Sequence, residues 1–320
     1  MHRRTFLGAT AAGALAAATP LAPAIPIIDT HIHLFDPNRP QGVPWPPKDN
    51  PVLYHPALPD RYRKIAVPLG INGAIEVEAS PWLEDNQWVL DVAAKDTIIV
   101  GTVGDLEPGQ PDFAKHLERF HRNPLFRGIR YGNLWGRNFA AEAAKPAFIA
   151  DLKLLAGAGL VMDTANPDPA LIATVVRLTE RVPELRLVLD HLPQCTPPPD
   201  AAGRAVYDSN LRELGKRPNV YAKLSAIFRR IDGKVVEDPA FYRSRLDELY
   251  GIFGEDRVVY GSDWPNSDST APYLKVLELA RAYFNTKSLA AQEKYFWKNS
   301  VAAYRWVKRE SAQPEPSKAV

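Results

Sequence analysis

Short apolar runs alternate with longer amphipathic segments along most of this chain. The runs are rich in Ile, Val and Leu, which is typical of parallel strands covered on both faces. They span Ile25 to His31, Gly73 to Ala79, Thr97 to Val103, Phe126 to Tyr131, Gly159 to Thr164, Leu185 to His191, Val220 to Ser225 and Val258 to Asp263. Segments with the length of crossover helices lie between them, namely Trp82 to Ala94, Asp112 to Arg122, Pro146 to Ala156, Pro169 to Val182, Asp208 to Lys216 and Pro239 to Phe253.

This alternation predicts parallel strands joined by helices. Eight strands are a full set for a closed (β/α)8 TIM barrel, which needs about 250 residues and fits as a single α/β domain in this chain of 320. A doubly wound open sheet has similar local signals. The barrel is favoured because chemically active residues follow many of the strands and not only those at one switch point.

The first 24 residues differ from the rest and resemble a twin-arginine export signal. Paired arginines at Arg3 and Arg4 precede a short Ala-rich run, and Ala22-Pro23-Ala24 has the small residues of a cleavage site. The run is too short for a membrane span, so no stable membrane anchor is expected. The sequence thus predicts a signal at 1–24, a barrel at 25–310, a flexible polar tail at 311–320, and a periplasmic or secreted protein.

Composition limits the classes of partner that are expected. The net charge is +2 and no Lys/Arg tract is present, so nucleic acid is not an expected partner. The single cysteine, Cys195, excludes an intrachain disulfide framework.

A proline-rich segment, residues 36–59, is too long for a tight connection and is expected to form a lid or wall over the barrel mouth. Oligomeric state is not specified by these features.

Two distant motifs are expected to meet at the mouth of the barrel. His31 and His33 are two apart on the first strand, so they point to the same side. Asp263 follows the last strand. In a closed parallel barrel the first and last strands are neighbours and their carboxyl ends share one mouth. The three side chains can therefore share one metal ion or one substrate.

Five strand-end motifs together resemble the amidohydrolase superfamily, and within it the branch with sugar lactonases and 2-pyrone-4,6-dicarboxylate lactonase. The motifs are Ile28-Asp29-Thr30-His31-Ile32-His33, Arg127-Gly128-Ile129-Arg130, Leu189-Asp190-His191-Leu192, Tyr221-Ala222-Lys223-Leu224-Ser225 and Gly261-Ser262-Asp263-Trp264-Pro265. The resemblance covers nearly all of the chain after the signal. It implies a barrel hydrolase that opens a lactone or a related cyclic ester by water attack.

The metal content that the resemblance implies is open. Metal-rich members of the superfamily add two further histidines and a carboxylated lysine or carboxylate, whereas His191 is the last histidine here, so a binuclear site is not expected. One divalent ion, Zn or Mn, could be held by His31, His33 and Asp263, with Glu78 or His191 completing the set. A metal-independent mechanism, in which the same histidines bind the substrate carbonyl, is the alternative.

Lactone opening needs a base, an electrophile for the oxyanion and groups that orient the ring. Asp263 is the expected base, which takes a proton from water and returns it to the leaving alkoxide; its alternative role is a helix cap. His31 and His33 are expected to polarise the carbonyl, directly or through the metal, unless they are buried histidines bonded to backbone. His191 is expected to ligate the metal or bind the oxyanion, or else to support its neighbours.

Basic residues suggest an acidic small-molecule substrate. Arg127 and Arg130 are three apart, so on a regular strand only one of them faces the mouth, and Arg130 is the expected one. Its guanidinium suits a carboxylate; the alternative is an ion pair with a neighbouring carboxylate such as Glu78. Lys223 has the same two options, and Glu78 itself is a further candidate substrate contact. A metal-dependent decarboxylase and a binding protein without catalysis are the competing functions.

Overall fold

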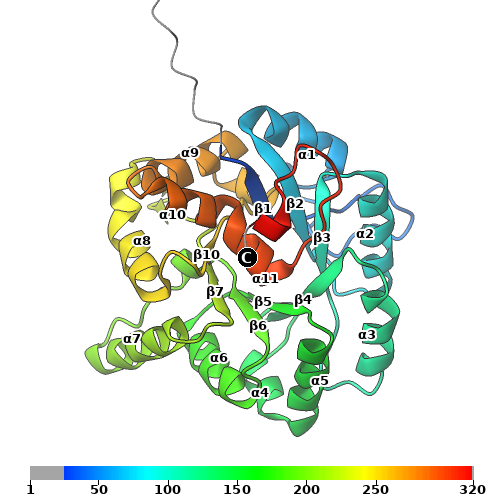
Figure 1. Ribbon diagram of the computed structural model, residues 1–320, viewed down its shortest axis with the longest axis horizontal. Helices are drawn as coiled ribbons and strands as arrows, with labels where there is room; N and C mark the ends of the chain where they lie inside the picture. The colour runs from blue at the N-terminus through cyan, green and yellow to red at the C-terminus, as the bar shows by residue number, and fades with distance from the viewer. Residues whose placement is uncertain (1–24, 319–320) are drawn as a thin grey trace, which may run out of the picture.

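The computed structural model describes residues 25–318 and contains a barrel of eight parallel strands (Figure 1). Each strand pairs with the next one along the chain, so the strand order follows the sequence. The strands are β1 (Ile27–Ile32), β2 (Ile71–Val77), β3 (Ile99–Gly104), β4 (Phe126–Gly132), β5 (Val161–Ala165), β6 (Arg186–Leu189), β7 (Val220–Lys223) and β10 (Val258–Val259). The predicted TIM barrel is confirmed.

Backbone hydrogen bonds close the barrel between its first and last strands. The Thr30 amide donates to the Tyr260 carbonyl at 3.1 Å, and the His33 amide donates to the Trp264 carbonyl at 2.7 Å. In the other direction the Asp263 amide donates to the His31 carbonyl at 2.8 Å. β10 is only two residues long, but the chain after it continues along β1, and this places Asp263 directly beside the two histidines.

Helices surround the barrel (Figure 1). Three of them begin with an aspartate whose carboxylate accepts a backbone N–H of the first turn: Asp168, Asp200 and Asp238. The Asp200 cap starts its helix well before the predicted start at residue 208. The helices are α1 (Pro59–Ala66), α2 (Leu83–Lys95), α3 (Phe113–His121), α4 (Phe139–Ala144), α5 (Pro146–Gly157), α6 (Pro169–Arg181), α7 (Ala201–Gly215), α8 (Pro239–Phe253), α9 (Tyr273–Phe284), α10 (Leu289–Glu293) and α11 (Asn299–Tyr304).

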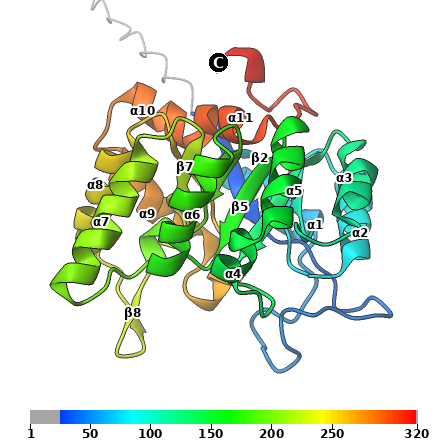
Figure 2. The same ribbon diagram turned by 90° about the horizontal axis from the view of Figure 1, so that it is seen from below.

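The two ends of the barrel are covered differently. At the end where the strands begin, α11 packs against the barrel interior, and Val301 and Tyr304 join one apolar cluster with Ile28, Val161 and Val259. Figure 2 shows α11 at the opposite end of the barrel from the loop after β1 and from the hairpin of β8 (Arg230–Ile231) and β9 (Lys234–Val235). The end where the strands finish is therefore the mouth.

The proline-rich segment forms part of the wall of this mouth. Its two ends are joined by paired backbone hydrogen bonds between Phe35 and Ala57. Between them, the Trp45 ring packs edge-on against His33, with ring centroids 5.5 Å apart. The segment thus brings an indole to the candidate site.

The start of the C-terminal tail packs against the barrel. Gln313 is 2% exposed, and its side-chain amide donates to the Thr97 carbonyl at 2.8 Å. The expectation of a flexible tail therefore does not hold for this part of it.

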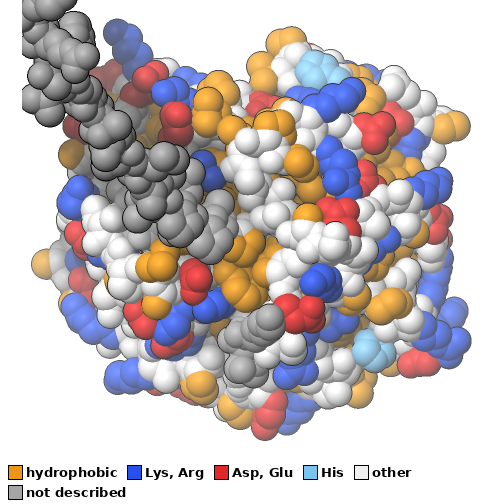
Figure 3. Space-filling model, turned by 45° about the horizontal axis from the view of Figure 1, so that its top comes forward, with side chains coloured by type: hydrophobic (Ala, Val, Ile, Leu, Met, Phe, Trp, Pro, Cys, Tyr) orange, Lys and Arg blue, Asp and Glu red, His pale blue; other side chains and the backbone are white. Residues whose placement is uncertain are grey.

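On the face drawn in Figure 3, positive and negative side chains are interspersed. Among the described helices, none has the length and apolar character needed to cross a membrane. The export signal predicted at residues 1–24 lies outside the described residues.

Candidate active site

Three histidines converge on one aspartate at the barrel mouth. The Nε2 atom of His33 lies 3.2 Å from Oδ1 of Asp263, that of His191 lies 3.6 Å away and that of His31 3.7 Å away. All four side chains are buried. They come from β1 and from the chain just after β6 and β10, as the sequence predicts. The structure thus brings together His31, His33, His191 and Asp263.

Local backbone geometry aims two of these side chains inward. His191 and Asp263 both have positive φ, 52° and 63°, a conformation that residues with a side chain rarely adopt and that functional sites tolerate. Asp29 anchors the second of these turns: its Oδ1 accepts the Ser262 amide at 2.8 Å, and its Oδ2 accepts the hydroxyls of Tyr62 and Tyr273 at 2.9 Å. This buried carboxylate ties the end of β10 to β1.

The hydrogen bond at Nδ1 of His33 determines whether the other ring nitrogen, Nε2, carries a proton. Its Nδ1 lies 2.8 Å from the Val77 carbonyl, which only accepts, so Nδ1 carries a proton. In the neutral ring Nε2 is then bare, and it faces the Asp263 carboxylate at 3.2 Å. Two electron-rich atoms at this distance require a proton or a cation between them.

The cluster fits a single divalent metal ion. Two sets of donor atoms among the described residues are close enough to share an ion, His31 with His33 and Asp263, and His31 with Asp190 and His191. The Nε2 atom of His31 is buried and has no hydrogen-bond partner. Imidazole nitrogens with a carboxylate are ligands that suit Zn and Mn. Glu78 belongs to neither set.

Burial and neighbouring charges lower the pKa values of His31, His191 and Asp263. Burial, followed by the nearby Lys223 ammonium, holds the pKa of His31 well below its ordinary value. Burial likewise lowers the pKa of His191. For Asp263, burial alone would oppose ionisation, but the three histidines outweigh it and lower the pKa of this carboxyl. Neutral imidazoles can ligate a cation, and a carboxylate can accept a proton.

A buried ionic layer lies behind the histidines, and Lys223 is its centre. The Lys223 ammonium lies 2.8 Å from Asp163 and 2.7 Å from Asp190, and its side chain is 0% exposed. It also lies 3.1 Å from Nδ1 of His31. Lys223 was a candidate substrate contact, but the structure pairs it with carboxylates, the alternative considered above. Removal of one partner from such a buried pair costs several kcal/mol, roughly 3–5.

The structure separates the two candidate arginines. Arg130 points toward the mouth, where its Nε lies 3.2 Å from Asp190 and its Nη1 3.7 Å from Glu78. Arg127 points toward the other end of the barrel, where it donates to the backbone carbonyls of Tyr304 and Pro124. Arg127 is therefore no substrate contact, because its guanidinium is bonded at the end of the barrel opposite the mouth.

The cluster forms one side of a cavity of about 230 Å³. Two indoles, Trp45 and Trp135, and three side-chain amides lie around it. Trp135 and the amides are not predicted from the sequence, because they lie on irregular loops where no periodicity indicates them. The lining residues are His33, Trp45, Glu78, Ala79, Arg130, Leu134, Trp135, Asn166, His191, Gln194, Asp263 and Asn266.

A closed barrel with a His/Asp cluster at its carboxyl-terminal mouth defines a class, the barrel hydrolases. The model of an amidohydrolase family matches residues 28–306. The chain belongs to this amidohydrolase family, and it is a hydrolytic enzyme. The resemblance predicted from the strand-end motifs is confirmed.

Two relatives and one solved structure extend this result. An L-fucono-1,5-lactonase of Burkholderia ambifaria is 30% identical over 250 residues, which are 75% of this chain and 80% of the relative. An L-fucono-1,5-lactonase of Burkholderia multivorans is 26% identical over 91% of this chain and 98% of the relative. A zinc-bound amidohydrolase from Burkholderia multivorans has the same fold, with a TM-score of 0.75 and 23% identity over 88% of this chain and 99% of that one.

Proposed function

We propose that this protein hydrolyses a lactone by water attack at the barrel mouth. The convergence of three imidazole Nε2 atoms on Oδ1 of Asp263, beside a cavity large enough for a small ring, carries the proposal. The two lactonases among the relatives support the reaction class. A decarboxylase of the same superfamily is the second candidate, and the two lactonases among the relatives favour hydrolysis.

Each residue of the site has its own role in this reaction. Asp263, ionised at neutral pH, accepts a proton from the attacking water. His31 and His33 polarise the lactone carbonyl, and His191 stands beside them as a further donor or ligand. One divalent ion, Zn or Mn, bound by His31, His33, Asp263 and His191, would act as a Lewis acid on this carbonyl. In a metal-independent reaction the imidazoles would bind the oxyanion themselves.

The lining of the cavity suggests where to search for the substrate. An acidic lactone was expected from Arg130, but that guanidinium already faces Asp190 and Glu78. Indoles that pack on a ring and amides that bond hydroxyl groups suit a polyhydroxylated substrate. We therefore infer that lactones of sugar acids come first among substrates, and acidic lactones stay a second prediction.

A substrate panel tests the proposal. Protein purified without chelator is assayed for its metal content and for acid release from L-fucono-1,5-lactone, other sugar-acid lactones and 2-pyrone-4,6-dicarboxylate. Release of acid above the spontaneous rate supports a lactonase. If no lactone reacts, while carbon dioxide is released from aromatic carboxylates, the decarboxylase is correct and the lactonase proposal is wrong.

We also propose export through the twin-arginine route, on the sequence pattern of residues 1–24 alone. Arg3→Lys together with Arg4→Lys should leave the protein in the cytoplasm, because the paired arginines are the part of the signal that this route reads. Fractionation of cells followed by immunodetection measures the result. Lys64→Arg, an exchange between the same two basic residues at an exposed position of α1, is the control and should leave export unchanged. Unchanged export of the double variant would contradict the prediction.

A further inference from the structure

We propose that Glu78 is the acid that protonates the departing ring oxygen of the lactone. This inference rests on the proposed lactone hydrolysis and adds a second carboxyl group to it. It replaces the simpler scheme in which Asp263 returns its own proton to the leaving group. Three observations support it: the hydrogen bonds of Glu78, the charges around it, and its place across His33 from Asp263.

The first observation is that one oxygen of Glu78 accepts two hydrogen bonds and the other accepts none. Oε2 accepts the Ser80 amide and the Trp135 indole N–H, both at 3.1 Å. Oε1 has no hydrogen-bond partner and lies 3.7 Å from Nη1 of Arg130, and Glu78 is one of the residues that line the cavity beside Asp263. A carboxyl group held in this way has one oxygen that can carry a proton without loss of a hydrogen bond.

The second observation concerns the charges that face Glu78. Burial raises the pKa of Glu78 to about 8, and the Arg130 guanidinium and the Trp135 hydrogen bond only partly oppose this. Asp105, from the end of β3, adds to the increase, and Arg137 from the loop after β4 reduces it. Glu78 therefore holds its proton at neutral pH, whereas Asp263 is a carboxylate. Two carboxyl groups whose environments separate their pKa values in one cavity are a natural acid and base.

The third observation is the placement of the two carboxyl groups around His33. Val77, which precedes Glu78, accepts the proton of His33 Nδ1, and the Nε2 atom of the same ring faces Asp263. The imidazole thus stands between the strand that carries Glu78 and the base. A lactone carbonyl held at this imidazole has Asp263 on one side, and Glu78 is within the same cavity for the ring oxygen.

The proton balance of the reaction then closes. Asp263 takes one proton from water as the water oxygen bonds to the carbonyl carbon. The bond between this carbon and the ring oxygen breaks, and the ring oxygen takes the proton of Glu78 and becomes a hydroxyl. The product is a hydroxy acid, with Asp263 protonated and Glu78 ionised. Transfer of the Asp263 proton to Glu78, directly or through solvent, restores the enzyme.

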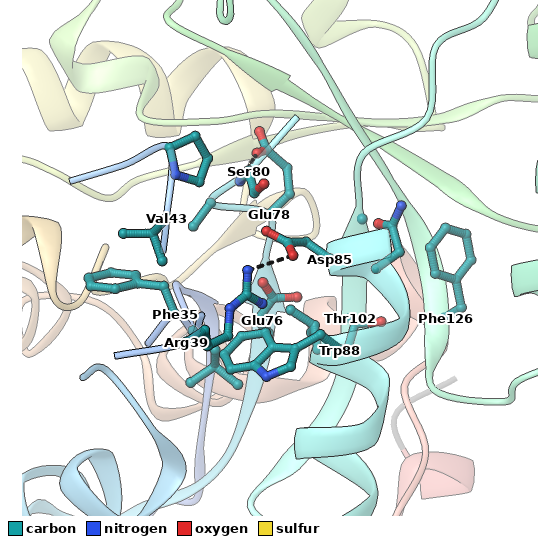
Figure 4. A pocket seen from close by; sticks show the side chains of 16 residues that line it. Phe35, Arg39, Val43, Glu76, Glu78, Ser80, Asp85, Trp88, Thr102 and Phe126 are labelled. Carbon is teal, nitrogen blue, oxygen red and sulfur yellow. Dashed lines mark hydrogen bonds and ion pairs between the residues drawn. The ribbon is translucent and has the colours of Figure 1, made fainter. Parts of the chain in front are cut away.

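Glu76 is a matched control on the same strand. It is buried, its Oε1 also has no partner, and burial raises its pKa well above the ordinary value. It is not a lining residue of the substrate cavity. Figure 4 shows Glu76 near the ion pair of Arg39 and Asp85, in a second pocket whose wall also includes Glu78, with the Glu78 carboxyl turned toward Ser80. Glu76→Gln removes a buried acid of similar surroundings without change to the substrate cavity.

The test compares Glu78→Gln with Glu76→Gln on two leaving groups. Glutamine keeps an acceptor for Ser80 and Trp135 but cannot release a proton. With L-fucono-1,5-lactone, whose leaving group is an alkoxide, Glu78→Gln should lower kcat by about 10²-fold. With dihydrocoumarin, whose leaving group is a phenolate of pKa about 10, it should change kcat little, because a phenolate departs without help. Glu76→Gln should leave both rates unchanged.

The pH profile of the unmodified enzyme gives an independent readout that needs no variant. An acid must be protonated, so kcat for L-fucono-1,5-lactone should be highest below pH 8 and fall as pH rises through the pKa of Glu78, about 8. The fall should be absent for dihydrocoumarin and absent in Glu78→Gln. Circular dichroism confirms that the variant is folded.

The possible outcomes distinguish failure of the role of Glu78 from failure of the proposed lactone hydrolysis. Equal loss with both leaving groups, or no loss in Glu78→Gln while the unmodified enzyme hydrolyses the lactone, overturns the role of Glu78 and leaves lactone hydrolysis standing. If the variant does not fold, the two pH profiles of the unmodified enzyme decide, and identical profiles overturn the proposal. Failure of the unmodified enzyme on every lactone overturns both.

Discussion

Asp263→Asn should lower kcat by about 10² to 10⁴ while the protein remains folded. The carboxylate is the one anionic group on which the three imidazoles converge, and their proximity keeps it ionised. Asparagine has nearly the same shape but cannot accept a proton from water. It also keeps an oxygen for the Asn266 amide, which donates to Asp263 Oδ2 at 2.8 Å. The measurement is steady-state acid release from the best lactone of the panel.

Asp268→Asn is the control for this variant. Asp268 lies five residues further on and pairs with Arg61 at 3.1 Å, and it is not a lining residue of the substrate cavity. It should keep the kcat of the unmodified enzyme. A near-normal kcat of folded Asp263→Asn at neutral pH would show that this carboxylate is not the base.

His31→Ala and His33→Ala should each lose bound metal and activity together. The described residues offer few donors, so a site that loses one imidazole cannot replace it. Metal content after purification without chelator and kcat on the same samples are the two measurements. If the reaction needs no metal, chelator leaves the rate unchanged and both variants still fail, because the imidazoles then donate to the oxyanion directly.

His121→Ala is the matched control, because His121 is exposed at the end of α3. It should keep both metal and activity. Circular dichroism separates loss of function from loss of fold, which matters for His33 because its ring also bonds the Val77 carbonyl. Retention of metal and activity in both variants would show that β1 does not form the site, and the proposed mechanism would then be abandoned.

The fold and the centre of the site follow from local rules that a sequence expresses directly. Apolar runs alternate with amphipathic segments, and eight of them require closure to bury both faces of the sheet. Closure puts the first strand beside the last, so the pair His31 and His33 and the distant Asp263 meet at one mouth. Each step depends on a period or on strand order, and both are visible along the chain.

Side-chain partners do not follow from such rules. Arg127 and Arg130 belong to one strand but have different partners. Arg127 donates to a backbone carbonyl at the far end of the barrel. Arg130 faces the carboxylates of Asp190 and Glu78. Lys223 has the length to reach the mouth, but the buried carboxylates Asp163 and Asp190 hold it. A buried ammonium must pair with an anion, and which anion is near depends on residues from other strands.

The barrel, its eight strands and the convergence of His31, His33, His191 and Asp263 can be predicted from the chain alone, because these depend on spacing within elements and on their order. The raised pKa of Glu78, the pairing of Lys223 and the contribution of Trp45 and Trp135 to the cavity become visible only in the folded protein. These depend on burial and on contacts between loops far apart in the chain, and neither the desolvation of a carboxyl group nor the path of an irregular loop is encoded in a local period.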